Sequence, residues 1–332
     1  MSVGGPTSRR PDMNATVPED GWRKASLSKA SAVFGLCLAV IAVNCALLYA
    51  YLRDRDFRTQ ARYVLYAHLL INDVMLLTGS MTMQVVTYST RLAFIPCSVL
   101  ILVFSSANKI SPMNLAAMAV ERYVAVCRPL HHARLCRVRR AHGAIALMWL
   151  VSLTAGLADI ITAFATTAAS ALSAAVPVCY PPAVFNTPQH RTLSLVTQVL
   201  LFSGVSTAVV LTYYRVALAA RAATGSDRAS AQKARGTIGL HAVQLLVCLL
   251  SYVSPLVVAR LAAIYPSESL KMIYASFLLV NVLPRMLSSL VYGVRDKKFN
   301  AGLRVHFCCE RGGRRRHGRK VRLAVAVVVK NN

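Results

Sequence analysis

Seven long apolar runs restrict the fold of this chain more than any other feature of its sequence. Each run has about 20 or more mostly apolar residues, which is enough for an α-helix to cross the hydrocarbon core of a bilayer. The sequence therefore predicts an all-α, seven-transmembrane helix bundle. The runs lie at residues 30–52, 62–88, 94–127, 141–163, 194–220, 236–261 and 270–294.

The composition agrees with a membrane protein and disfavours other classes. Of the 332 residues, 56% are apolar and 15% are charged, whereas about a quarter of the residues in a soluble domain are charged. The net charge of +26 would suit a nucleic-acid binder, but basic residues between apolar runs have a membrane explanation. We therefore expect no nucleic-acid partner. The spacing of the Cys and His residues is not typical of a metal site, so we also expect no metal and no cofactor.

The Lys and Arg residues are concentrated on one side of the predicted bundle. The segments at 53–62, 128–140, 215–235 and 295–330 carry 26 of the 38. Because basic loops stay in the cytoplasm, the chain is expected to have an extracellular N-terminus. The predicted organisation is an extracellular segment at 1–29, the bundle at 30–294, and a cytoplasmic helix and basic tail at 295–332.

A glycosylation sequon, Asn14-Ala15-Thr16, lies in the predicted extracellular segment. It is compatible with N-glycosylation of Asn14 on that side of the membrane.

The inner end of the third apolar run carries the most informative motif. Glu121, Arg122 and Tyr123 begin the string ERYVAVCRPL. The string resembles the signature of rhodopsin-like G-protein-coupled receptors, in the form that odorant receptors have. Further positions that carry the resemblance, notably to fish odorant-like receptors, are Asn44, LLIND at 69–73, Trp149, Lys233-Ala234-Arg235, His241, and LPRMLSSLVYGVRD at 283–296.

This resemblance implies a chemosensory receptor of the plasma membrane. Such a receptor binds a small, odorant-type ligand and activates a heterotrimeric G protein of the olfactory or stimulatory type, and it is not an enzyme. The alternative is a non-olfactory rhodopsin-like receptor for a peptide or another small ligand. A transporter is less favoured, because the sequence shows no pair of related halves with Gly- or Pro-interrupted helices.

The resemblance also assigns roles to the residues at the cytoplasmic face. Glu121 holds Arg122 in one state and releases it toward the G protein in another, and Tyr213 and Tyr292 match tyrosines that swing inward on activation. From the residues alone, Arg122 reads equally as an arginine that reaches toward the headgroups. A lone tyrosine at that level is more often an interfacial anchor.

Asp73 is the deepest acidic residue of the predicted helices, and an ionisable group in lipid indicates function. In rhodopsin-like receptors this Asp often binds sodium together with a Ser that Ser111 matches. Here Arg285 lies one turn before Ser289, on the face expected to look toward Asp73, so we predict an Asp73–Arg285 ion pair in place of the metal. An Arg285 side chain directed at the headgroups is the alternative. The predicted polar network comprises Asn44, Asp73, Ser111, Arg285 and Ser288.

The cysteines give two further expectations. Cys97 and Cys179 match the disulfide that ties the second outer loop to the bundle in this superfamily. Cys308 and Cys309 follow an amphipathic stretch that predicts a short eighth helix, and they are candidates for palmitoylation, although unmodified thiols fit equally well. The basic run at 311–322 is expected to contact anionic lipid of the inner leaflet.

The ligand pocket is expected between the outer halves of the third, fifth, sixth and seventh helices, as the resemblance implies. Each candidate there fits helix packing as well as ligand contact. Lys109 has two interpretations, because it could pair with Asp159 or attract an acidic ligand. The candidates are Phe104, Ala107, Asn108, Lys109, Gln198, Phe202, Tyr252 and Tyr274.

Three departures from the rhodopsin-like pattern affect the helix hinges. Ser288-Ser289 stands in place of the Asn-Pro pair of the seventh helix, so the proline that kinks that helix is expected to be missing. The fifth helix also lacks a proline. In the sixth, Ser251 stands where a proline is usual, and Pro255 follows four residues later. The helices are therefore expected to hinge at other positions during activation.

Overall fold

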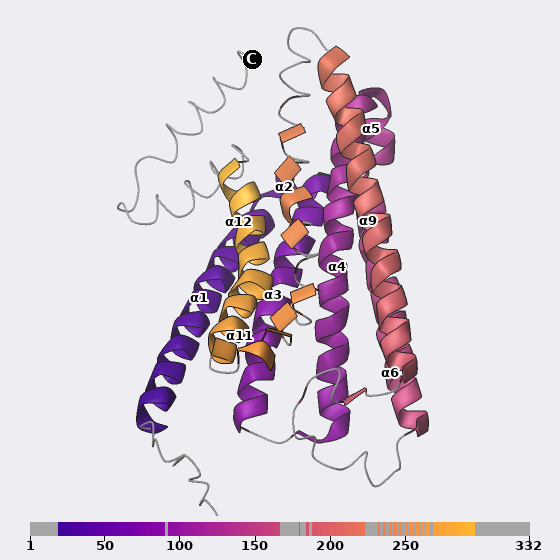
Figure 1. Ribbon diagram of the computed structural model, residues 1–332. Helices are drawn as coiled ribbons and strands as arrows, with labels where there is room; N and C mark the ends of the chain where they lie inside the picture. Colours follow the sequence, from indigo (N-terminus) through magenta and orange to yellow (C-terminus); the bar gives the residue numbers. More distant parts are fainter. Residues whose placement is uncertain are drawn as a thin grey trace, which may run out of the picture.

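The computed structural model describes most of the chain and shows a bundle of long helices (Figure 1). The described residues are 19–89, 92–166, 179, 184–185, 188–222, scattered positions between 232 and 265, and 268–295. The sequence features that lie outside them are Asn14, Tyr252, the side chain of Tyr292, the predicted eighth helix, Cys308 and Cys309.

The helices follow the apolar runs closely. Among the described residues, five helices are long and apolar enough to cross a membrane. The seventh predicted span is a helix in three parts. The long helices are α1 (Glu19–Arg53), α3 (Ala61–Ser89), α4 (Phe94–Cys127), α6 (Val138–Thr166) and α9 (Pro188–Ala222), and the last span consists of α11 (Ser269–Phe277), η2 (Leu278–Val282) and α12 (Leu283–Arg295).

Three features differ from the sequence-based expectation. Helix α1 begins at Glu19, eleven residues before the apolar run, because a helix can continue through polar residues that hydropathy does not detect. The segments at 53–62 and 128–140 contain the short helices α2 (Arg55–Arg58) and α5 (Pro129–Leu135). The seventh helix contains a π-helical turn, η2, directly before Pro284 and α12, which hydropathy does not detect.

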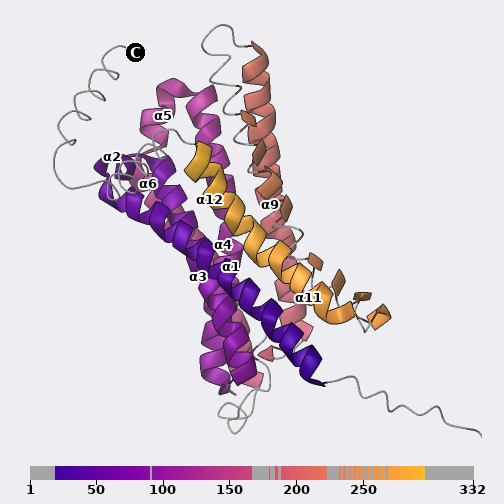
Figure 2. The same cartoon turned by 90° about the vertical axis from the view of Figure 1, so that its left-hand side faces the viewer.

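Helix α4 lies at the centre of the bundle. It packs against α3, α6 and α9, while α1 and α12 pack against each other and against α3. Figure 2 shows α1 and α12 side by side on this flank. The short helices α2 and α5 lie at one end of the bundle, the upper end in Figure 1, and α1 begins at the other end.

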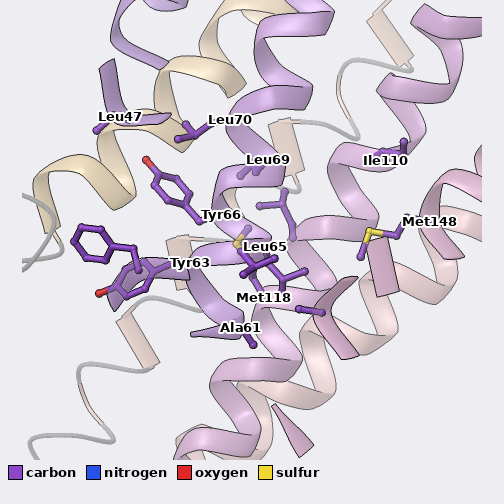
Figure 3. Packing of buried hydrophobic residues seen from close by; sticks show 14 of the residues in the cluster. Leu47, Ala61, Tyr63, Leu65, Tyr66, Leu69, Leu70, Ile110, Met118 and Met148 are labelled. Carbon is purple, nitrogen blue, oxygen red and sulfur yellow. The ribbon is translucent and has the colours of Figure 1, made fainter. Parts of the chain in front are cut away.

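A hydrophobic cluster holds together the half of the bundle that carries α2 and α5 (Figure 3). Tyr63, Tyr66 and Leu70 at the start of α3 pack with Ile110 and Met118 of α4. All five side chains are at most 2% exposed. Lipid tails are as apolar as these side chains, so the hydrophobic effect does not drive the helices together. Close van der Waals packing stabilises the contact instead. The cluster fixes the end of α4 that carries Glu121 and Arg122.

Candidate functional site

Glu121 lies near the C-terminal end of α4 and is held from two sides. The Nε of Arg122 lies 3.6 Å from Glu121 Oε2, and the Nε2 of His132, in α5, lies 3.3 Å from Oε1. The Glu121 side chain is 7% exposed, against 21% for Arg122 and 38% for His132. The buried carboxylate therefore interacts with a guanidinium through one oxygen and with an imidazole through the other.

The sequence did not single out His132. It reaches Glu121 because Arg128 ends helix α4 and Pro129 starts α5, which turns the chain back toward α4. A proline is well suited to the first position of a helix, where its missing N–H is not needed. Pro129 is therefore the local sequence signal for the start of α5. Nothing in the sequence indicates that His132 contacts Glu121.

Tyr123 and Tyr213 have different neighbours. Tyr123 is partly buried and packs against Val216 of α9. Tyr213 is 38% exposed, and its Cε2 lies 4.0 Å from the position that a Cβ would take at Gly239, in the sixth predicted span. Tyr213 therefore faces the sixth predicted span.

Cys136 follows α5 and lies near Glu121. Burial raises the pKa of the Cys136 thiol, and the negative charge of Glu121 raises this pKa further, while Arg140 opposes the shift. Less thiolate is present at neutral pH than in a solvated cysteine, so this thiol is a poor nucleophile there.

The polar core joins α3 to α12. The Ser288 hydroxyl donates a hydrogen bond to Asp73 Oδ2, and Arg285 Nε lies 3.9 Å from Asp73 Oδ1. The Arg285 and Asp73 side chains are 3% and 4% exposed. The structure therefore places Asp73 and Arg285 at ion-pair distance inside the bundle.

The Arg285 guanidinium has two further partners. Its Nη1 donates to the Val280 carbonyl at 2.8 Å, and its Nη2 donates to Asn108 Oδ1 at 3.4 Å. In an α-helix the Val280 carbonyl would accept from the N–H of residue 284, but Pro284 has none. The π-helical turn η2 ends directly before this point. The Arg285 guanidinium thus supplies to the Val280 carbonyl the hydrogen bond that Pro284 cannot donate.

The hydrogen-bond partners of Asn44 and Ser111 are residues that the sequence did not single out as site residues. Ser289 donates to Asn44 Oδ1 at 2.5 Å. Asn72 Nδ2 donates to Ser111 Oγ at 2.9 Å and to the Ala107 carbonyl at 2.9 Å. Ser111 is thus engaged by Asn72, which precedes Asp73 in the chain and turns toward α4.

The predicted disulfide between Cys97 and Cys179 is present, with an S–S distance of 2.03 Å. Both residues are buried and pack with Phe94 and Phe185. The bond fixes residue 179 to the N-terminal end of α4.

The structure separates the pocket candidates on α4 and α9. Asn108 contacts Arg285, and Ala107 is buried with its carbonyl bound to Asn72. Phe202 is buried in the α4–α9 contact, where it serves packing. The side-chain amide of Gln198 donates to Ser194, one turn earlier on the same helix, at 3.4 Å.

The remaining candidates lie elsewhere in the bundle. The Phe104 Cδ2 lies 3.3 Å from the position that a Cβ would take at Gly79 of α3. Tyr274 packs with residues of α1 and α3, away from α4. Lys109 is half-buried on α4, and the side chain of Asp159 lies outside the described residues.

Comparison with known proteins agrees with this geometry. The family model of the 7 transmembrane receptor (rhodopsin family) matches residues 43–291. Odorant receptor 131-2 of Danio rerio is 28% identical over 271 residues, which cover 81% of this chain and 83% of that protein. Olfactory receptor 51E1 of Homo sapiens is 24% identical over 273 residues, or 80% and 85% of the two chains.

A shorter match extends to a receptor of another class of ligand. The human Adenosine receptor A2b is 41% identical over 64 residues, which cover 19% of this chain and 18% of that receptor. The family match, by contrast, spans most of the chain, including the Glu121-Arg122-Tyr123 motif and the polar core. The chain is therefore an all-α membrane protein that belongs to the rhodopsin family of seven-transmembrane receptors.

Proposed function

We propose that this protein is a chemosensory receptor of the plasma membrane, with its N-terminus outside the cell. It binds a small ligand in the outer half of the bundle and activates a heterotrimeric G protein through Arg122. Two full-length relatives are an odorant and an olfactory receptor, which supports this class of ligand.

The observation that carries the proposal is the arrangement around Glu121. Its carboxylate is buried, and Arg122 contacts one of its oxygens. The 21% exposed Arg122 side chain already has access to the cytoplasm. Activation then requires only that the 3.6 Å contact breaks and that the guanidinium turns toward the G protein.

The polar core provides the link between the ligand and this switch. Arg285 contacts Asn108, at the depth of the predicted pocket, and Asp73, which is bonded to Ser288. A ligand that displaces Asn108 would change the position of the guanidinium and so the contact of α3 with α12. In this scheme Arg285 takes the place of the sodium ion that the core of other rhodopsin-like receptors holds.

The test is a cyclic-AMP reporter screen with water-soluble and volatile odorants. An N-terminal epitope tag, detected on intact cells, reports both surface expression and orientation. Arg122→Ala is expected to abolish every response, whereas Arg139→Ala, a change at an exposed arginine of α6, should leave the response intact. Responses that survive in Arg122→Ala would refute the role of this residue. A response to peptides or nucleosides, and to no odorant, would favour the non-olfactory alternative.

A further inference from the structure

A basic cleft opens at the cytoplasmic face beside the Glu121–Arg122 pair. It has a volume of about 510 Å³ and lies between the first residues of α3, the last turns of α4, the short helix α5 and the start of α6. Its charged walls are the guanidinium groups of Arg62, Arg122 and Arg137, and the carboxylate of Glu121. Three fixed positive charges therefore face one negative charge, which favours an anionic ligand.

Two helix N-termini add to this positive potential. Ala61, the first residue of α3, and Val138, the first residue of α6, both line the cleft. The first N–H groups of a helix have no partner within the helix, and together with the helix dipole they favour negative charge. Neither helix has an acidic residue in its first turn. Backbone donors of this kind bind phosphate groups in many proteins.

Two of the arginines are held in place by neighbouring groups. The Arg62 guanidinium carbon lies 4.2 Å from the centre of the Tyr63 ring, and the guanidinium donates to the Tyr63 hydroxyl. Arg137 Nε donates to the Ala133 carbonyl at 3.4 Å. A side chain that is already restricted loses less conformational entropy when a ligand binds. The planar guanidinium also matches the geometry of phosphate oxygens.

We propose that this cleft binds a multiply phosphorylated anion, such as the headgroup of a phosphoinositide in the inner leaflet. The site lies at the cytoplasmic ends of three membrane-spanning helices, α3, α4 and α6, where such headgroups are found. The bound phosphates would contact Arg62 and Arg137 and would compete with Glu121 for Arg122. This binding site rests on the proposed orientation of the bundle, which the epitope tag reports separately, and not on the chemosensory ligand.

The test measures the affinity of the purified full-length receptor for three probes: a short-chain phosphatidylinositol bisphosphate, soluble inositol trisphosphate and short-chain phosphatidylserine. Arg137→Gln should weaken binding of the bisphosphate lipid about tenfold, which corresponds to the loss of one hydrogen bond to a charged group. Arg62→Gln should act in the same direction. Glu121→Gln removes the one carboxylate of the cleft and should tighten binding about threefold.

Arg139→Gln is the matched control, because Arg139 is exposed on the same helix as the cleft wall but does not line the cleft. It should change the affinity less than about twofold, within the scatter expected for a screened surface charge. The basic tail is the same in all variants, so differences between them report the cleft.

The pattern across the variants decides the proposal and also identifies the source of the phosphates. If inositol trisphosphate binds with the same pattern, the phosphates suffice, and if only the lipid does, its acyl chains contribute. Either result supports the proposal. Equal losses in Arg137→Gln and Arg139→Gln, an unchanged affinity in Glu121→Gln, or phosphatidylserine binding as tightly as the bisphosphate would overturn it. The absence of binding by all probes would overturn it as well.

Discussion

Neutralising either member of the Asp73–Arg285 pair should destabilise the receptor strongly, because the other charge stays inside the bundle. Nε and Oδ1 are 3.9 Å apart, and the side chains are 3% and 4% exposed. At this distance two unit charges attract by about 4 kcal/mol for an effective dielectric constant of about 20. Removing one partner of a buried pair typically costs about 3–5 kcal/mol, whereas replacing both is often neutral.

The two single variants are expected to differ. Asp73→Asn leaves a guanidinium that cannot lose its proton, whereas Arg285→Gln leaves a carboxyl group that can take one up. We therefore expect a loss of about 4 kcal/mol for Asp73→Asn and of about 3 kcal/mol for Arg285→Gln. The double variant should recover more than half of the summed loss.

The assay is the fraction of detergent-solubilised receptor that still elutes as a monodisperse peak after heating, measured across a double-mutant cycle. Losses that simply add in the double variant would refute the pairing, because independent sites are additive. A second readout is the effect of sodium chloride against choline chloride on the same heating curve. The wild type should show no sodium-specific shift, whereas Arg285→Gln should gain stability in sodium. A shift in the wild type would contradict the replacement of the metal by Arg285.

Three further predictions concern other parts of the bundle. Trp149→Phe removes the indole donor 3.1 Å from His68 Nε2 and should cost about 1–2 kcal/mol in the same heating assay. Alkylation of Cys136 should be slow at neutral pH and should rise with pH, because its raised pKa leaves little thiolate, and Glu121→Gln should accelerate it, as measured by mass spectrometry. Cys97→Ser opens a disulfide between residues 82 positions apart and should cost about 2–5 kcal/mol, seen as lower surface labelling of the epitope tag.

The helices could be predicted from the sequence because burial in lipid leaves a local signal. An apolar run of sufficient length defines a span without knowledge of its neighbours. The structure describes α3, α4 and α9 close to the predicted ranges. The short helices α2 and α5 leave no such signal, since they have four and seven residues, and their stability comes from tertiary contacts.

The polar core was predictable in part, because helical periodicity shows which residues share a face. Arg285 and Ser289 are four residues apart, so both turn toward α1 and α3. The contacts of Asn72 with Ser111 and of His132 with Glu121 depend on the rotation of one helix against another and on the path of a loop. Periodicity gives neither quantity. The same limit applies to Phe202, whose register fits a pocket or a packed interface equally well.

Pro284 explains how the seventh helix accommodates an arginine at the depth of the core. The proline deprives the Val280 carbonyl of its helical donor, and the same guanidinium that pairs with Asp73 donates to this carbonyl. Gln244 of the sixth span donates to the Pro284 carbonyl at 3.3 Å. The Val280 carbonyl in this irregular turn thus accepts a hydrogen bond from the Arg285 guanidinium, which offsets part of the free-energy cost of burying its charge. The sixth and seventh helices meet at this turn, where η2 and Pro284 interrupt the regular helix just before Ser288 and Ser289.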